Sequence, residues 1–319
     1  MAVAEYRHSP ALRALDYVFI LRPTVAVGMW VFFLSGAALA SRAGGIRFSL
    51  LYPSGQVLLG LTVSTLVLGG GLLLNQIVDV ESDRVNNKLF FLPRGLITIR
   101  AAWAELVLVW ALAALLSTLL SPHFRFVAAA ALVVNVTYSA PPVRAKSRFP
   151  LDLIWNALGF GFASVAAGWA SVTPLTSAVV PLGLTYGLAV AGVTASAAIP
   201  DLEGDRRSGL ATTAAVLGEH STSLLATILV SAAALCGAVL RDPVSFFGSV
   251  ASLPLFVRAH FTWARMHRIA ANQLMVAVFA IVVSIRAPYM LALLAVVYFG
   301  SRAYYRARFG LSYPGTGTP

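Results

Sequence analysis

Long apolar runs alternate with short polar segments along almost the whole chain. Each run is near the roughly 20 residues that a helix needs to cross a bilayer, and the last one is interrupted by Arg286-Ala287-Pro288, so it is either one kinked helix or two short ones. The pattern predicts an all-α, polytopic membrane protein with about nine transmembrane helices, and it leaves nine or ten open. The runs cover residues 24–41, 56–79, 102–120, 124–141, 151–170, 178–199, 223–240, 243–258 and 272–300.

Composition supports a membrane protein. Of the 319 residues, 59% are hydrophobic and 11% are charged, whereas a soluble domain carries about 25% charged residues. We expect one transmembrane domain over residues 1–311. The segment 312–319 is rich in Gly, Pro and Thr, so we expect it to be disordered. The single cysteine, Cys236, allows no disulfide within the chain.

The net charge of +11 does not predict a nucleic-acid partner, because the basic residues form neither a face nor a tail. They concentrate in alternate loops, and the loops richer in Lys and Arg face the cytoplasm. We therefore expect an integral protein of the cell membrane whose acidic clusters, described next, face the cytoplasm. The basic residues of the C-terminal segment fit the same side and favour an even number of spans. The opposite loops carry only Arg42, Arg47, Arg125 and Arg241.

Six of the twelve acidic residues lie in two short clusters, 79–83 and 201–205. Carboxylates are costly at membrane depth unless they are paired or bind a metal. Solvated acids that close two helix ends are the alternative interpretation. Two clusters on the same side of a chain with so few acids favour a shared binding site.

The spacing within each cluster suggests the ligand. Asn75, Asp79 and Asp83 are four residues apart, so a helix aligns them along one stripe. Asp201 and Asp205 repeat this spacing, with Glu203 between them. Two facing stripes would form an all-oxygen site, which suits Mg²⁺ together with a bound diphosphate. Neither cluster contains a histidine.

Basic and hydroxyl residues near the clusters complete the candidate site. Arg22, Lys88, Arg94 and Arg206 could bind diphosphate oxygens and stabilise the leaving group, although they could equally set the topology. In the segment Tyr138–Lys146, a Pro-Pro pair stops the helix. The hydroxyl groups at that helix end are then free to face the same cavity.

Taken together, these motifs resemble those of the UbiA superfamily of intramembrane prenyltransferases. The resemblance implies a helical bundle around a central cavity, in which Mg²⁺ and both motifs bind the diphosphate of an allylic polyprenyl donor. It implies metal-binding roles for Asn75, Asp79, Asp83, Asp201 and Asp205, diphosphate-binding roles for Arg22, Lys146 and Arg206, and a place for Tyr138 near the reacting carbon. The matching segments are Leu21-Arg22-Pro23, the NxxxDxxxD motif at 75–83, the YSxPPxxxK segment at 138–146 and the second acidic motif at 199–206.

The chain departs from the pattern of the superfamily at two places. Ala197 and Ala198 stand where many members have Lys-Asp, so Asp201, Glu203 and Asp205 are the acids that remain. The loop 88–95 also lacks the Arg-Pro-Leu sequence followed by Gly that many members have. This loop is implied to cover the acceptor, so the usual aromatic acceptors, such as 4-hydroxybenzoate, are not carried over.

The leading hypothesis is Mg²⁺-dependent transfer of an isoprenyl group from a polyprenyl diphosphate to a lipophilic acceptor within the membrane. The first alternative is a membrane terpene cyclase, which needs no acceptor and uses aromatic faces to stabilise cations. The second is an ion-coupled transporter, which is disfavoured because its acids should lie mid-span beside broken helices. The acceptor, the donor length and the oligomeric state stay open. The aromatic candidates for a cyclase are Trp155, Phe160, Phe162, Trp169 and Tyr186.

Overall fold

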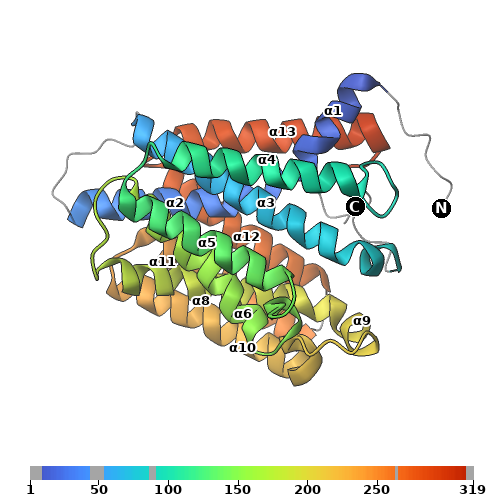
Figure 1. Ribbon diagram of the computed structural model, residues 1–319. Coiled ribbons are helices and arrows are strands. Elements are labelled where there is room, and N and C mark those ends of the chain that lie inside the picture. The colour runs from blue at the N-terminus through green and yellow to red at the C-terminus, as the bar shows by residue number, and fades with distance from the viewer. Residues whose placement is uncertain (1–8, 44–53, 86–90, 263–264, 314–319) are drawn as a thin grey trace.

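The computed structural model describes residues 9–43, 54–85, 91–262 and 265–313, and these form a bundle of helices (Figure 1). Within these ranges there is no strand, and the only β-type pairing is an isolated bridge between Arg148 and Ala211. The predicted all-α fold is therefore confirmed. The helices are α1 (Pro10–Phe19), α2 (Pro23–Ala43), α3 (Gly55–Val85), α4 (Ile99–Ser117), α5 (Pro122–Ser139), η1 (Ala145–Ser147), α6 (Leu151–Asn156), η2 (Ala157–Phe162), α7 (Ala163–Ala170), α8 (Val179–Ala198), η3 (Ile199–Asp201), α9 (Leu202–Arg207), α10 (Thr213–Val239), α11 (Pro243–Thr262), α12 (Arg265–Ser284) and α13 (Tyr289–Phe309).

The described helices agree with about nine spans. By length and composition, eight helical segments of the described chain can cross a membrane: α2, α3, α4, α6 with η2 and α7, α8 with η3 and α9, α10, α11 and α12. Two further helices, α5 with 18 residues and α13 with 21, run along the same bundle (Figure 1). The interrupted last run is a pair of helices, α12 and α13. They are separated by the turn that contains Pro288.

Helix α1 is an element that the apolar runs did not predict. Its Asp16 is buried against α13, where Oδ1 accepts hydrogen bonds from Tyr304 Oη at 2.6 Å and from Arg308 Nε at 3.0 Å. Oδ2 accepts a third hydrogen bond from Arg308 Nη2 at 2.9 Å. The amphipathic α1 is thus hydrogen-bonded to α13, the last helix of the described chain.

Glycines allow the central helices to approach closely. A Cβ at Gly168 of α7 would lie 1.8 Å from the Phe33 carbonyl oxygen of α2, and a Cβ at Gly36 would lie 2.1 Å from the Val165 carbonyl oxygen. Helices α2 and α7 therefore pack backbone to backbone, as small residues permit in membrane bundles. Gly161 packs in the same way against Gly187 of α8, since its Cβ would lie 2.8 Å from the Gly187 Cα.

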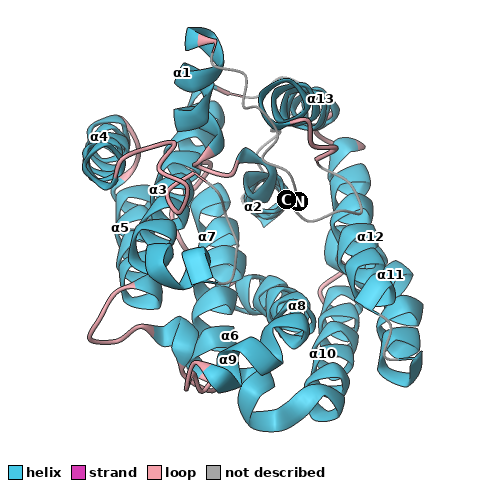
Figure 2. Cartoon of the chain, turned by 90° about the vertical axis from the view of Figure 1, so that its right-hand side faces the viewer, coloured by secondary structure: helices cyan, strands magenta, loops and turns pink. Residues whose placement is uncertain are grey.

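The predicted site lies at one end of the bundle. The C-terminal ends of α3 and α5, the start of α6, and α9 all lie there (Figure 1). Figure 2 shows the bundle turned by 90°, with α2, α8 and α12 around its middle and α13 beside α12. Tyr313, just beyond α13, is hydrogen-bonded to Thr24 at 3.1 Å. Residues 314–319, most of the predicted tail, lie outside the described chain.

Candidate active site

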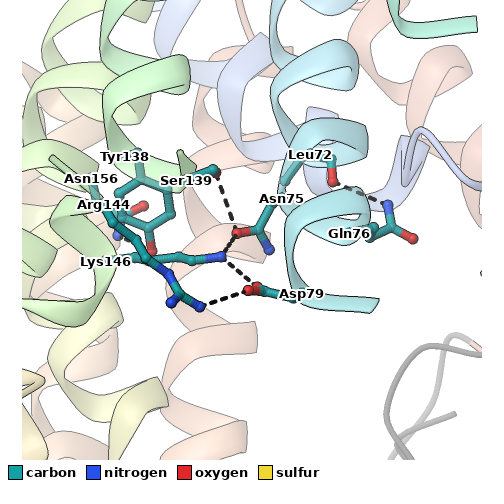
Figure 3. A network of polar contacts seen from close by, with 9 residues as sticks. All are labelled: Leu72, Asn75, Gln76, Asp79, Tyr138, Ser139, Arg144, Lys146 and Asn156. Carbon is teal, nitrogen blue, oxygen red and sulfur yellow. Dashed lines mark hydrogen bonds and ion pairs between the residues drawn. The ribbon is translucent and has the colours of Figure 1, made fainter. Parts of the chain in front are cut away.

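Lys146 lies at the centre of a polar network between α3 and the segment after α5 (Figure 3). Its Nζ donates hydrogen bonds to Asn75 Oδ1 at 2.7 Å and to Asp79 Oδ2 at 2.5 Å. Arg144 Nη2 lies 3.4 Å from the other oxygen of Asp79. Two oxygens of the first predicted stripe therefore already face one cation, as expected from their four-residue spacing on a helix.

The chain after α5 explains how Lys146 reaches α3. Helix α5 ends at Ser139 before Pro141-Pro142, because proline cannot continue the helical hydrogen bonding. Arg144 then adopts a left-handed conformation with φ of 43°, and the short helix η1 follows. Ser139, at the end of α5, donates a hydrogen bond to Asn75 Oδ1 at 3.3 Å.

Burial and charge act on Lys146 in opposite directions. Its side chain is 13% exposed. Loss of hydration lowers the pKa of Lys146 below its ordinary value, and the Asp79 and Asp83 carboxylates only partly oppose this shift. Asp83, which is also buried, is therefore within electrostatic range of the same ammonium group.

Gln76, in the first motif, points away from this network (Figure 3). Its Nε2 donates to the Ile20 carbonyl oxygen at 2.7 Å, and also to the Leu72 carbonyl oxygen at 3.1 Å. Ile20 lies between α1 and α2, so Gln76 joins that connection to α3. No pattern in the sequence predicted this contact.

The second acidic cluster lies where α8 continues through η3 into α9. Asp205 Oδ2 accepts a hydrogen bond from Thr212 Oγ1 at 2.8 Å, and Asp201 and Glu203 are exposed. Arg206, a predicted diphosphate ligand, donates from Nε to the Ala215 carbonyl oxygen at 2.9 Å. This cluster therefore lies at the start of α10.

A pair of loops connects the two clusters. The Phe149 amide donates to the Ala211 carbonyl oxygen at 2.6 Å, and the Ala211 amide donates to the Ser147 carbonyl oxygen at 3.2 Å. The segment that carries Lys146 is thereby held beside the segment that follows Asp205.

Asp152 reinforces this connection, although it belongs to none of the sequence motifs. It is 5% exposed, and its carboxylate accepts hydrogen bonds from the Thr213 amide at 2.7 Å and the Thr213 hydroxyl at 2.6 Å. Helix α6 is thus tied to the first turn of α10. A lone acid at the start of a predicted span was the only available signal.

An apolar cavity of about 320 Å³ lies between α2, η2, α8 and α12. Asn156, at its edge, donates a hydrogen bond from Nδ2 to Tyr138 Oη at 3.0 Å, so the cavity wall adjoins the polar network. Phe32, Phe160 and Phe279 line the cavity, and Phe32 packs on the other two with ring centroids 5.8 Å and 5.6 Å away. Tyr186 is fully buried, and its ring centroid lies 5.1 Å from that of Phe32.

The other aromatic candidates lie elsewhere. Phe162 lines a separate groove, Trp169 is buried, and Trp155 Nε1 donates a hydrogen bond to Thr137 Oγ1 at 2.8 Å.

The remaining basic candidates are dispersed. Arg22 is half-buried in the connection between α1 and α2, with a left-handed φ of 56°, and its charge acts on Tyr305 of α13. Arg94 is exposed in the turn before α4. Lys88 lies outside the described residues. The geometry thus brings together Asn75, Asp79 and Lys146, and diphosphate binding by Arg22 and Arg94 stays a prediction.

The donor atoms suit Mg²⁺. The side chains of Asn75, Asp79 and Asp83 offer only oxygen, as do those of Asp201 and Asp205, and Mg²⁺ prefers such ligands. Asn75 Oδ1 and Asp79 Oδ2 converge on one cation, the Lys146 ammonium. Within the described chain, no three acidic, histidine or cysteine side chains gather closely enough to form a metal cage alone. A bound ion would therefore need ligands from water or substrate, which Mg²⁺ usually keeps.

The sequence profile of the UbiA prenyltransferase family matches residues 28–283, which include both acidic clusters and Lys146. The chain belongs to this family. The membership predicted from the motifs is therefore confirmed. Helices α1 and α13 of this UbiA-family chain, which hold the Asp16–Arg308 contact, lie outside the matched residues.

Relatives with assigned activities are distant. The chain is 26% identical to the chloroplastic 2-acyl-4-prenylphloroglucinol 6-prenyltransferase of Humulus lupulus over 72% of this chain and 58% of that protein. It is 29% identical to the digeranylgeranylglyceryl phosphate synthase of Sulfolobus acidocaldarius over 54% of this chain and 61% of that protein. The chain thus spans about six tenths of the length of these relatives.

Solved structures confirm the fold. A UbiA homolog from Archaeoglobus fulgidus, bound to GPP and Mg²⁺, superposes with a TM-score of 0.64 at 20% sequence identity. The match covers 88% of this chain and 100% of that one. The apo UbiA homolog from Aeropyrum pernix K1 gives a TM-score of 0.62 at 19% identity, over 86% of this chain and 98% of that one. At these identities the likeness concerns the fold alone.

Proposed function

We propose that this UbiA-family protein transfers an isoprenyl group from an allylic polyprenyl diphosphate to a lipophilic acceptor within the membrane. The observation that carries the proposal is a polar network, Asn75–Asp79–Lys146, adjoining an aromatic-lined apolar cavity through Asn156 and Tyr138. Such a site has one place for a charged head group and another for an apolar tail.

The head group would bind between the acidic clusters. Asn75, Asp79 and Asp83 would hold Mg²⁺ on one side, and Asp201 and Asp205 would hold it on the other. When bound, Mg²⁺ neutralises charge that develops on the departing diphosphate. The homolog from Archaeoglobus fulgidus, solved with GPP and Mg²⁺, supports this assignment. Glu203 would assist at the exposed edge of α9.

Lys146 has the central protein role in leaving-group departure. Its ammonium group can donate hydrogen bonds to diphosphate oxygens as the allylic carbon–oxygen bond breaks, which stabilises the leaving group. Arg22, Lys88, Arg94 and Arg206 are further candidates for these oxygens.

The tail and the cation would occupy the apolar cavity. The rings of Phe32, Phe160 and Phe279 exclude water there, and aromatic faces stabilise cations. Tyr138 is placed by Asn156 at the boundary between the cavity and the polar network. The acceptor then forms a bond to the allylic carbon and loses a proton.

Topology supports a site on the cytoplasmic side of the cell membrane. The loops at the end of the bundle that carries Asp79, Lys146 and Asp205 hold the excess of basic residues, and such loops remain in the cytoplasm. The membrane itself would deliver both the polyprenyl donor and the acceptor.

The test compares Asp79→Asn and Asp205→Asn with Glu81→Gln. Glu81 is the matched control, because it is an exposed acid on the same helix as Asp79 and pairs with Arg84 at 2.9 Å. Purified proteins are given Mg²⁺, geranylgeranyl diphosphate and a total lipid extract, and diphosphate release is measured. Both Asn variants should stay folded in detergent and lose at least roughly 100-fold in rate, as expected for lost transition-state charge stabilisation.

Two outcomes would change this assignment. If either Asn variant keeps the rate of Glu81→Gln, the acidic clusters do not hold the catalytic metal. If the wild-type protein releases diphosphate equally well without the lipid extract, it acts as a cyclase or hydrolase. The aromatic lining of the cavity would suit a cyclase.

A further inference from the structure

Three arginines from separate connections lie around one buried acid, Asp242. The connections that carry them lie at the end of the bundle opposite the acidic clusters (Figure 1). Arg42 ends α2, Arg241 lies in the turn before α11, and Arg286 lies in the turn between α12 and α13. All three are exposed, whereas Asp242 is 2% exposed. Because Arg42 and Arg286 act electrostatically on Asp242 and on each other, the group is a true cluster.

The acid and the arginines of the cluster differ in their hydrogen bonding. Asp242 Oδ1 accepts a hydrogen bond from the Val244 amide at 3.2 Å and so caps α11, and its carboxylate also interacts with the buried Tyr186 hydroxyl. Within the described residues, the guanidinium groups of Arg42, Arg241 and Arg286 donate no hydrogen bond. Their donors are available to a ligand.

The charges of the cluster do not balance. One carboxylate faces three guanidinium groups, and burial raises the pKa of Asp242 above its ordinary value. Desolvation and the charge of Arg42 lower the pKa of Arg286. A bound anion would relieve this repulsion. Arginines gathered at this end also run against the general bias of basic residues toward the cytoplasmic side.

The adjoining surface is hollow and partly aromatic. A cavity of about 400 Å³ is lined by Arg42, Arg241 and Asp242 together with Phe246 and Phe247 of α11. Arg286 lines a neighbouring cavity, which shares Arg42 and Asp242 with the first. Phe247 is 52% exposed. Guanidinium groups bind phosphate through paired hydrogen bonds, and exposed phenylalanines at the end of a membrane bundle contact acyl chains.

We propose that the cluster of Arg42, Arg241 and Arg286 is a binding site for the phosphate of an anionic phospholipid. The lipid phosphate accepts hydrogen bonds from the arginines, and its acyl chain lies along Phe246 and Phe247. A lipid rather than free phosphate is the expected occupant because the hollow joins charged and aromatic walls at the membrane end of three helices. The bound lipid links α2, α11 and the turn after α12, and so stabilises the bundle.

The experiment measures lipid binding by the purified protein in neutral detergent. The variant Arg42→Gln/Arg241→Asn/Arg286→Gln removes the three charges, and Asn suits the left-handed φ of 52° at position 241. Arg125→Gln is the matched control, since Arg125 is exposed in the first turn of α5 at the same end of the bundle. Thermal unfolding is followed during titration with phosphatidylglycerol, phosphatidylcholine or inorganic phosphate.

Phosphatidylglycerol should raise the unfolding temperature of the wild type and of Arg125→Gln, and phosphatidylcholine should not. The triple variant should bind phosphatidylglycerol roughly a hundredfold more weakly, and single variants roughly fivefold, in line with the attraction of each basic residue to anionic lipid. An unchanged response in the triple variant, or in the single variants if the triple does not fold, overturns the proposal. An equal effect of inorganic phosphate overturns the lipid assignment and leaves a free-anion site.

Discussion

Replacing Lys146 tests whether this side chain serves the reaction or the stability of the protein. Lys146→Met keeps the length of the side chain and its apolar contacts but removes the ammonium group, which donates to Asn75 and Asp79. Lys146→Arg keeps the charge but changes the geometry from a point charge to a planar fork. We expect the two variants to differ strongly in turnover and little in stability.

The expected stability change follows from two opposing terms. Losing the two hydrogen bonds costs about 1–3 kcal/mol in the free energy of unfolding. Removing the buried ammonium group offsets part of this loss, because the ammonium group is costly to desolvate. Desolvation is the largest cause of the lowered pKa of Lys146. Arg144 still neutralises Asp79 from 3.4 Å. We therefore expect Lys146→Met to lose less than about 2 kcal/mol at neutral pH.

The pH dependence gives an independent check. Since the pKa of Lys146 is lower in the folded protein than its ordinary value of 10.5, the unfolded chain binds this proton more tightly. The free energy of unfolding of the wild type should therefore rise as the pH increases from the lowered pKa toward 10.5. Lys146→Met should lack this rise. Denaturant unfolding in detergent, measured over this pH range, makes the comparison.

Turnover should respond far more than stability. Loss of one donor to the leaving group should slow diphosphate release by about 10²–10³-fold in Lys146→Met, whereas Lys146→Arg should retain part of the rate. A Met variant that keeps wild-type turnover would refute the role of Lys146 in leaving-group departure. A loss of stability far above the expected limit would instead show that the lysine mainly holds the fold.

Three further predictions concern the fold and the cavity. Asp16→Asn should cost about 3–5 kcal/mol in denaturant unfolding, because it leaves the buried Arg308 without a charged partner; an unchanged midpoint would contradict this. Phe32→Leu should enlarge the cavity and shift competition between geranyl and geranylgeranyl diphosphate toward the longer donor, and an unchanged product ratio would contradict this. Gly168→Ala should lower the unfolding temperature much more than Gly204→Ala, whose added Cβ meets no atom within 4 Å.

The sequence predicted the spans and the common face of Asn75 and Asp79. Apolar runs indicated the helices because a bilayer requires about 20 such residues, and the four-residue spacing placed both side chains on one stripe of a helix. The sequence could not show that both contact Lys146, because that contact depends on how the chain turns after α5. The resemblance implied Lys146 only as a diphosphate partner.

Helix α1 and the split between α12 and α13 illustrate the limits of the apolar pattern. Helix α1 is short and amphipathic, so it gives no long apolar run, and its position depends on Asp16 meeting Arg308 almost 300 residues away. The sequence around Pro288 already indicated a possible break in the last apolar run. Whether the chain bends or reverses there is decided by packing of α13 against α2 and α12.

The scarcity of acids that identified the clusters also explains the acids outside them. In an apolar setting a lone carboxylate is favoured where a partner compensates its desolvation. Three of the twelve acids follow this rule, whereas Glu105 of α4 has an oxygen without a partner among the described residues. Asp16 pairs with Arg308, Asp152 accepts two hydrogen bonds from Thr213, and Glu219 pairs with Arg268. Each of these contacts joins helices far apart in sequence. Asp242 differs, because it caps its own helix and lies beside an excess of arginine. That excess of positive charge is the reason to expect an anionic ligand there.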